Sequence, residues 1–151
     1  GSPMEPERYN RVLDAAQLRP DLAMLPAGDM TGIGERGINL SGGQKQRATL
    51  ARGLIRNAPV LILDDCFSAV DTETEEHILS RLKLLRAGLT TILVSHRVST
   101  LRHTDRILVL EEGQLVESGS HEALLAAGGV YAELERLQTQ GQNVPETEII
   151  A

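Results

Sequence analysis

Hydrophobic and polar positions divide the chain into blocks whose spacing predicts first short helices and then alternating strands and helices. Residues 5–26 carry a modest apolar stripe at helical spacing, interrupted by Pro20 and Pro26, which predicts short helices. Residues 27–40 contain glycine at four positions, which is typical of a loop. The chain is therefore expected to open with a small helical part that ends in a glycine-rich loop.

A longer helix is predicted to begin directly after Ser41. The Ser41 hydroxyl is placed to accept a hydrogen bond from the first helical turn, and Gln44 completes the spacing of a capping box. Apolar residues then recur at helical spacing until Pro59, which stops the helix.

Two continuous apolar runs, at residues 60–63 and 90–94, predict strands that are covered on both faces, as in parallel sheets. The helix between them is predicted to begin after Asp71 and to end near Gly88. A hairpin and two short helices are expected at residues 106–118, 120–126 and 130–138. This alternation of strands and helices predicts an α/β fold.

These patterns divide the chain into four segments. Residues 1–4 are expected to be the remnant of a tag, 5–58 a helical subdomain, 59–138 part of an α/β subdomain, and 139–151 a disordered tail.

The composition narrows the possible functions. The 151 residues are 41% hydrophobic, which is enough for the core of one domain. A net charge of −6, with one Phe, two Tyr and no Trp, argues against a nucleic-acid surface. A single cysteine, Cys66, excludes a disulfide framework and is expected to be a packing residue. No apolar run approaches the ~18 residues that cross a bilayer, and no signal peptide opens the chain, so a soluble cytosolic domain is expected.

The start of the predicted helix at Ser41 is a candidate phosphate site. Gly42 and Gly43 are poor helix formers, each costing roughly 1 kcal/mol relative to Ala. Their advantage is that bare backbone N–H groups at the positive end of a helix can touch a phosphate. An ordinary glycine-rich cap remains an equal alternative.

Polar residues at the ends of two predicted strands are the second candidate site. Asp64 and Asp65 end an otherwise apolar strand, at the edge where ligand sites of α/β folds form. Such carboxylates suit Mg²⁺, although they could also only cap the turn. His96 ends the next strand at the same edge, where a structural and a catalytic role are equally supported.

The segment from Gly32 to Gly37 matches the dinucleotide fingerprint G-x-G-x-x-G. That fingerprint requires a strand before it and a helix directly after it, and neither is predicted here. A flexible loop is the favoured interpretation.

Taken in order, the sequences at residues 40–44, 61–65, 68–71 and 95–96 resemble the ATPases of ATP-binding cassette (ABC) transporters. They match the signature, the Walker B strand, the D-loop and the switch histidine of that family, and the resemblance covers about residues 7–138. Residues 31–37 are similar to the loop that contacts the coupling helices of the membrane domain in exporters. The resemblance implies a partial P-loop NTPase fold with a helical subdomain and a mostly parallel sheet that lacks the Walker A strand.

The resemblance also implies a role for each candidate residue in a parent protein that uses ATP and Mg²⁺. The residues Ser41, Gly42, Gly43 and Gln44 would reach across a head-to-tail dimer to ATP held by a second nucleotide-binding domain, with Asp71 coupling the two sites. Asp64 would hold Mg²⁺ through water, position 65 would hold the catalytic base, and His96 would contact the γ-phosphate. The parent would work at the cytoplasmic face of the cell membrane.

Two departures from the family change what is expected. Asp65 replaces the usual glutamate, which resembles the degenerate subunit of a heterodimeric exporter, so the partner is expected to be non-identical. No G-x-x-x-x-G-K-[ST] phosphate loop is present, so the isolated chain is expected to bind no ATP or to bind it weakly. The missing strand would lie between residues 92–94 and 107–110, and such a gap predicts self-association, strand exchange or rearranged pairing.

Two other functions compete with an exporter ATPase. One is the signature half of a DNA-repair or chromosome-structure ATPase, which would need a long heptad segment before Leu40 that the sequence lacks. The other is a stand-alone metallohydrolase that uses the carboxylates of Asp64 and Asp65 together with His96.

Overall fold

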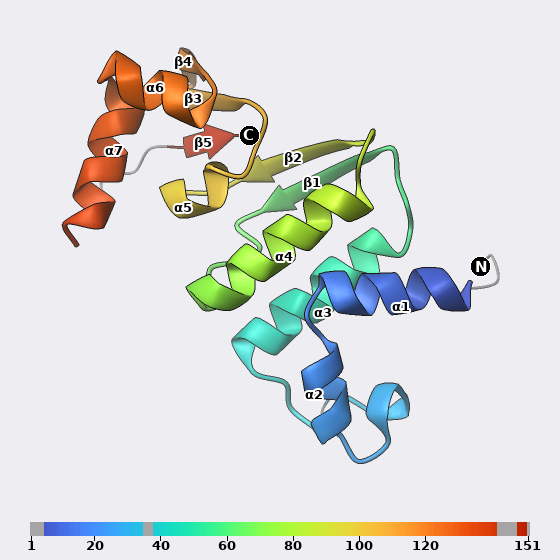
Figure 1. Ribbon diagram of the computed structural model, residues 1–151. Helices are drawn as coiled ribbons and strands as arrows, with labels where there is room; N and C mark the ends of the chain where they lie inside the picture. Colours follow the sequence, from blue (N-terminus) through green and yellow to red (C-terminus); the bar gives the residue numbers. More distant parts are fainter. Residues whose placement is uncertain (1–4, 35–37, 142–147, 151) are drawn as a thin grey trace. The chain divides into compact units, whose positions relative to one another are not determined.

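The structure is a computed structural model that describes residues 5–34, 38–141 and 148–150, the last three by their backbone alone (Figure 1). The expected tag remnant at 1–4, and parts of the expected loop and tail, lie outside these residues. The chain forms two compact units. The first contains residues up to 61 together with 66–90, and the second contains 62–65 together with the residues from 91 onward.

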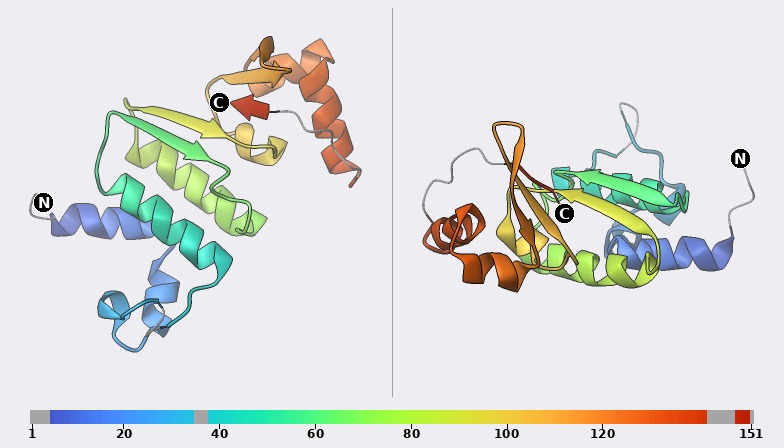
Figure 2. Two further views of the ribbon diagram at one scale, coloured as in Figure 1. Left: turned by 180° about the vertical axis from the view of Figure 1, so that it is seen from behind. Right: turned by 90° about the horizontal axis from the view of Figure 1, so that it is seen from above.

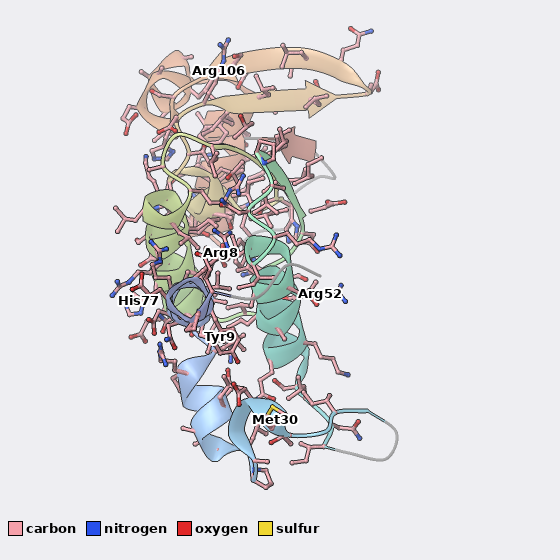
Figure 3. All side chains as sticks on the ribbon, turned by 90° about the vertical axis from the view of Figure 1, so that its right-hand side faces the viewer. Arg8, Tyr9, Met30, Arg52, His77 and Arg106 are labelled. Carbon is pink, nitrogen blue, oxygen red and sulfur yellow. The ribbon has the colours of Figure 1, made fainter. Side chains whose placement is uncertain are left out.

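The first unit is a group of helices. They are α1 (Pro6–Ala15), α2 (Arg19–Met24), the 3-10 helix η1 (Gly28–Met30), α3 (Gly42–Leu54) and α4 (Thr72–Leu85). Helix α1 packs against α3 and α4, and Figure 3 shows it end-on between them. Each of these three helices buries an apolar stripe, with Val12, Leu54 and Ile78 almost completely buried.

Two arginines tie the ends of these helices to neighbouring backbone. The Arg8 guanidinium donates to the carbonyls of Leu54 (2.6 Å) and Ile55 at the end of α3, where a positive charge also suits the helix dipole. Arg86, which is 5% exposed, donates to the carbonyls of Ala58 (3.0 Å) and Thr90 (2.7 Å). Burial, and secondarily the charge of Arg8, lowers the pKa of Arg86.

The division into units differs from the boundary that the sequence suggested near residue 58. Helix α4 clusters with the first unit, because it packs against α1. From the sequence, α4 was grouped with the strands on either side of it. In the structure it belongs to the first unit, because it contacts α1, which is far away in the sequence.

The second unit contains most of a five-stranded sheet. Its strands are β1 (Val60–Asp64), β2 (Thr90–Val94), β3 (Ile107–Glu111), β4 (Gln114–Gly119) and β5 (Glu148–Ile150), and the spatial order is β1-β2-β5-β3-β4. Three short helices complete the unit: α5 (Val98–Leu101), α6 (His121–Ala127) and α7 (Val130–Thr139). The mixed α/β fold predicted from the sequence is confirmed. None of the described helices combines the length and the apolar character needed to cross a membrane.

The expectation of a mostly parallel sheet is wrong for the described strands. β1 and β2 run in the same direction (Figure 1), whereas β3 pairs antiparallel with both β4 and β5, and β2 pairs antiparallel with β5. A hairpin with a two-residue turn can only be antiparallel, which accounts for the pairing of β3 with β4.

The C-terminal segment forms β5 between β2 and β3, where the sequence predicted a gap (Figure 2, left). Its residues pair with Leu108, Val109 and Leu110 of β3, and Ile150 also pairs with Val94 of β2. The sequence predicts a disordered tail over 139–151. Residues 148–150 form a strand instead, because the backbone groups of β2 and β3 offer them hydrogen-bond partners. This is one form of the rearranged pairing expected for the gap.

The core of the second unit surrounds Tyr131 of α7, whose side chain is completely buried. Its hydroxyl lies 2.9 Å from Nδ1 of His121. The Glu117 carboxylate caps the start of α7 by accepting from the backbone N–H groups of Val130 (2.6 Å) and Tyr131 (3.1 Å). Burial is the main cause that raises the pKa of Tyr131 to about 12.

We expect Tyr131 to make the stability fall at high pH. Its pKa is raised in the folded state, so its contribution is complete below the ordinary value near 10 and is lost as the pH rises toward 12. The loss at pH 11 is about 1.4 kcal/mol. In the Tyr9→Phe variant Tyr131 is the remaining tyrosine, and tyrosinate absorbance should show a midpoint near 12 when folded and near 10 in urea. A folded-state midpoint near 10 contradicts the prediction.

Candidate functional site

The first turn of α3 has the capping box that the sequence predicted. The backbone N–H of Gln44 donates to the Ser41 hydroxyl (3.2 Å), and the backbone N–H of Ser41 donates to the Gln44 side chain (2.9 Å). These two hydrogen bonds give partners to the backbone N–H of Gln44, inside the first turn, and to that of Ser41, just before it. The segment of residues 41–44 therefore has a defined geometry.

Gly42 and Gly43 lie between the two capping residues. Among the residues that the structure describes, no acceptor bonds the backbone N–H of either glycine. Both N–H groups belong to the first turn, which has no intrahelical partner for them. Together with the Ser41 hydroxyl they provide donors at the positive end of a 13-residue helix, which is a suitable place for an anion.

Gly43 also packs against the loop that follows β1. A Cβ at position 43 would lie 2.7 Å from the carbonyl oxygen of Ala69, so only glycine fits. Gln46, one turn further along α3, donates to the Ser68 hydroxyl (2.8 Å) and accepts from the backbone N–H of Ala69 (2.9 Å). The first turn of α3 and the predicted D-loop are therefore held together within the first unit.

Asp71 caps the start of α4, as predicted. Its Oδ1 accepts from the backbone N–H of Thr74 at 2.9 Å, and this hydrogen bonding lowers the pKa of Asp71. The carboxylate thus carries a negative charge at the start of a helix, where the helix dipole favours it.

Asp64 ends β1 and Asp65 follows it directly, both in the second unit, at the strand end that the sequence predicted. The backbone N–H of Asp65 donates to the Val94 carbonyl of β2 (3.1 Å), so the pairing of the two strands continues past Asp64. Asp65 has a φ of +43°, a left-handed conformation that aspartate tolerates better than most residues. Such conformations concentrate at functional sites, because the surrounding structure has to hold them.

The structure brings Asp65 and His96 together. Oδ1 of Asp65 lies 3.5 Å from Nδ1 of His96, and the two side chains are 52% and 63% exposed. Both are therefore accessible to a ligand. Asp64 is exposed as well, at the end of β1.

Two residues that the sequence did not single out hold these segments in place. Gln138 of α7 donates to the backbone carbonyl of His96 (2.5 Å) and accepts from the backbone N–H of Val98 (2.9 Å). Asp21 of α2 accepts from the side chains of Gln44 and Arg47. Both act from positions far away in the sequence, and no motif marks either of them.

The described residues were also compared with the ligand groups that metal ions need. No three His, Cys, Asp or Glu side chains among them are grouped closely enough to hold a metal ion. A lone strand-end carboxylate still fits Mg²⁺, which usually takes most of its ligands from water and phosphate.

The dinucleotide fingerprint is not supported. A 3-10 helix precedes Gly32, and α3 begins only at Gly42, so among the described residues no strand runs into this segment and no helix follows it directly. Gly37 lies outside the described residues.

Comparison with known proteins gives the family context. The family described as "ABC transporter" matches residues 8–68. A solved structure described as a bacterial Atm1-family ABC exporter with ATP bound is similar over 91% of this chain and 24% of that one, with a TM-score of 0.83 and 42% identity. The chain is homologous to the ATPase domains of ABC exporters.

Curated relatives agree with this homology. The ATP-dependent lipid A-core flippase of Burkholderia pseudomallei (strain 1710b) is 47% identical over 140 residues, which cover 93% of this chain and 24% of that protein. The flippase of Bordetella avium (strain 197N) is 49% identical over 132 residues, which cover 87% and 22%. The chain thus spans about a quarter of the length of these relatives.

Gly43 provides a test of the packing at the first turn of α3. We expect Gly43→Ala to lower the free energy of unfolding by about 1–3 kcal/mol, because its Cβ would collide with the Ala69 carbonyl.

The matched control is Gly53→Ala in the same helix, where the new Cβ would meet Leu61 at an ordinary 3.6 Å. That variant should gain about 0.5–1 kcal/mol from helix propensity. Urea unfolding measures both, and equal effects of the two variants would contradict the packing of Gly43 against Ala69.

Proposed function

We propose that the chain is part of the nucleotide-binding domain of an ABC exporter, in which ATP binding and hydrolysis power transport across a membrane. The observation that carries this proposal is the pair of open backbone N–H groups at Gly42 and Gly43, beside the Ser41 hydroxyl, in a chain homologous to exporter ATPases. Donors so arranged suit the phosphates of a nucleotide.

The signature turn serves a nucleotide held by a second nucleotide-binding domain. Ser41, Gly42 and Gly43 donate toward its terminal phosphate, and the side chain of Gln44 stabilises the turn from the other side. The contact between Gly43 and Ala69, and the bonds of Gln46 to the same loop, support a coupled movement of the signature and the D-loop. Asp71, at the end of that loop, couples the two nucleotide sites.

The carboxylates at the end of β1 serve the chain's own nucleotide site. Asp64 would hold Mg²⁺ through water, and the charge of the ion would offset that of the phosphates. Asp65 occupies the position of the catalytic base. His96, whose Nδ1 lies 3.5 Å from Oδ1 of Asp65, contacts the terminal phosphate. The aspartate is one C–C bond, about 1.5 Å, shorter than a glutamate, so it polarises the attacking water poorly. This makes the chain the degenerate subunit of an exporter whose partner subunit is non-identical.

The membrane domain of the parent contacts the segment between α2 and α3. Met24 at the end of α2, and Met30 and Ile33 within the segment, are 87%, 83% and 57% exposed, which is unusual for apolar side chains so close together in sequence. Met30, which is labelled in Figure 3, ends the 3-10 helix η1 within this segment. The coupling helices of a membrane domain would cover these side chains, which places the parent's nucleotide-binding domain at the cytoplasmic face.

The 151-residue chain by itself is expected to bind ATP in the millimolar range or not at all, and not to hydrolyse it. Its sequence contains no phosphate loop, which supplies the lysine and most of the backbone N–H groups that hold a nucleotide. Isothermal titration calorimetry with Mg-ATP measures this, and a micromolar dissociation constant would overturn the expectation.

In the full-length heterodimer, we expect Asp65→Glu to raise the rate of ATP turnover by roughly tenfold, because a displacement of about 1 Å at a catalytic group can change the rate ~10²-fold. Steady-state ATPase assays at saturating ATP measure the effect.

The matched control is Asp14→Glu, which makes the same substitution at an exposed ion pair with Arg19 in the first unit. Turnover that stays the same in a folded Asp65→Glu heterodimer counts against the degenerate-site assignment.

A further inference from the structure

Asp21, in the first turn of α2, holds two side chains of α3 with one carboxylate. Its Oδ1 accepts from Nε2 of Gln44 at 2.9 Å, and its Oδ2 accepts from Nη2 of Arg47 at 2.6 Å. Gln44 and Arg47 are three residues apart and so lie on the same face of the helix. The Asp21 and Arg47 side chains are only 15% and 14% exposed, so solvent screens their charges weakly.

The bond to Asp21 determines which way the Gln44 amide points. Oε1 of Gln44 accepts from the backbone N–H of Ser41, and this leaves Nε2 directed at Asp21. The reverse orientation would set Nε2 against an N–H group and Oε1 against a carboxylate, and neither pair can form a hydrogen bond. An acceptor at position 21 therefore selects the amide orientation that completes the capping box.

Arg47 depends on the same carboxylate. Its Nε is buried, with no hydrogen-bond partner among the described residues, and Asp21 supplies its ion pair. A Cβ at Gly43 would lie 3.6 Å from Nη1 of Arg47, so the guanidinium lies beside the backbone of the signature turn. Loss of Asp21 would leave a buried cation unpaired directly beside that turn.

We propose that Asp21 is a positioning residue for the signature turn. It holds Gln44 in the capping box and Arg47 beside Gly43, and so maintains the geometry in which Ser41, Gly42 and Gly43 meet a phosphate. This rests on the proposed function, in which the turn completes the nucleotide site of a second domain. Helix α2 thereby supports the nucleotide site through Asp21, although none of its residues contacts the nucleotide.

The first measurement is made on the 151-residue chain and needs no nucleotide. Hydrogen exchange followed by NMR reports the backbone N–H of Gln44, which donates to Ser41. We expect this exchange to accelerate roughly tenfold in Asp21→Ala, because the capping box loses the support of its amide. Asp21→Asn should be intermediate, since its side-chain oxygen can still accept from Gln44 but carries no charge for Arg47.

The matched control is Asp14→Ala, which removes the exposed ion pair with Arg19. Its Gln44 exchange should equal that of the unchanged chain. If Asp21→Ala does not fold, the comparison uses Asp21→Asn alone. The proposal is overturned if the backbone N–H of Gln44 exchanges at the same rate in the folded Asp21 variant and in the control.

The second measurement is ATP turnover by the full-length parent with its partner subunit. We expect kcat to fall roughly tenfold in Asp21→Ala, to recover partly in Asp21→Asn, and to stay unchanged in Asp14→Ala. Faster Gln44 exchange without any loss of turnover overturns the positioning role. Ser41→Ala distinguishes the two levels of the argument: if it leaves turnover unchanged, the proposed function of the turn fails, whatever Asp21 does.

Discussion

The start of α3 must remain a stable helix terminus while two of its backbone N–H groups keep no partner in the described structure. The capping box between Ser41 and Gln44 resolves this conflict, because it satisfies the groups on either side of the two glycines. Most of the polar contacts described around this turn support it. Asp21 and Arg47 hold it from α2 and from within α3, and Gln46 ties it to the loop that follows β1.

The second unit uses a different device to present its side chains. The pairing of β1 with β2 continues to Asp65, whose left-handed conformation then turns the chain away from the sheet. His96 reaches the same place because Gln138 holds its backbone carbonyl and the following segment. The two side chains are exposed, whereas the backbone that positions them is fixed by hydrogen bonds. Such an arrangement keeps the two side chains accessible to a ligand while their backbone stays in a fixed position.

Local signals in the sequence were sufficient for much of the fold. The cap at Ser41, the stop at Pro59 and the apolar runs at 60–63 and 90–94 each depend on neighbouring residues, and the corresponding elements are present. The site residues at strand ends could be found for the same reason, since a charge directly after an apolar run is visible in sequence. Asp21 and Gln138 could not be found in this way. Their roles depend on partners 23 to 42 residues away, which no short pattern records.

Reading the amino-acid sequence alone was enough to mark the candidate site residues: a glycine pair behind a serine cap, two carboxylates at the end of a buried strand, and a histidine after the next strand. It also determined where most elements begin and end, because caps and breakers act within a few residues. The tertiary structure decided the rest. It grouped α4 with α1, placed β5 between β2 and β3, and directed Asp21 at Gln44 and Arg47. These outcomes follow from burial and from the need of backbone and charged groups for partners, which are satisfied only when distant segments meet.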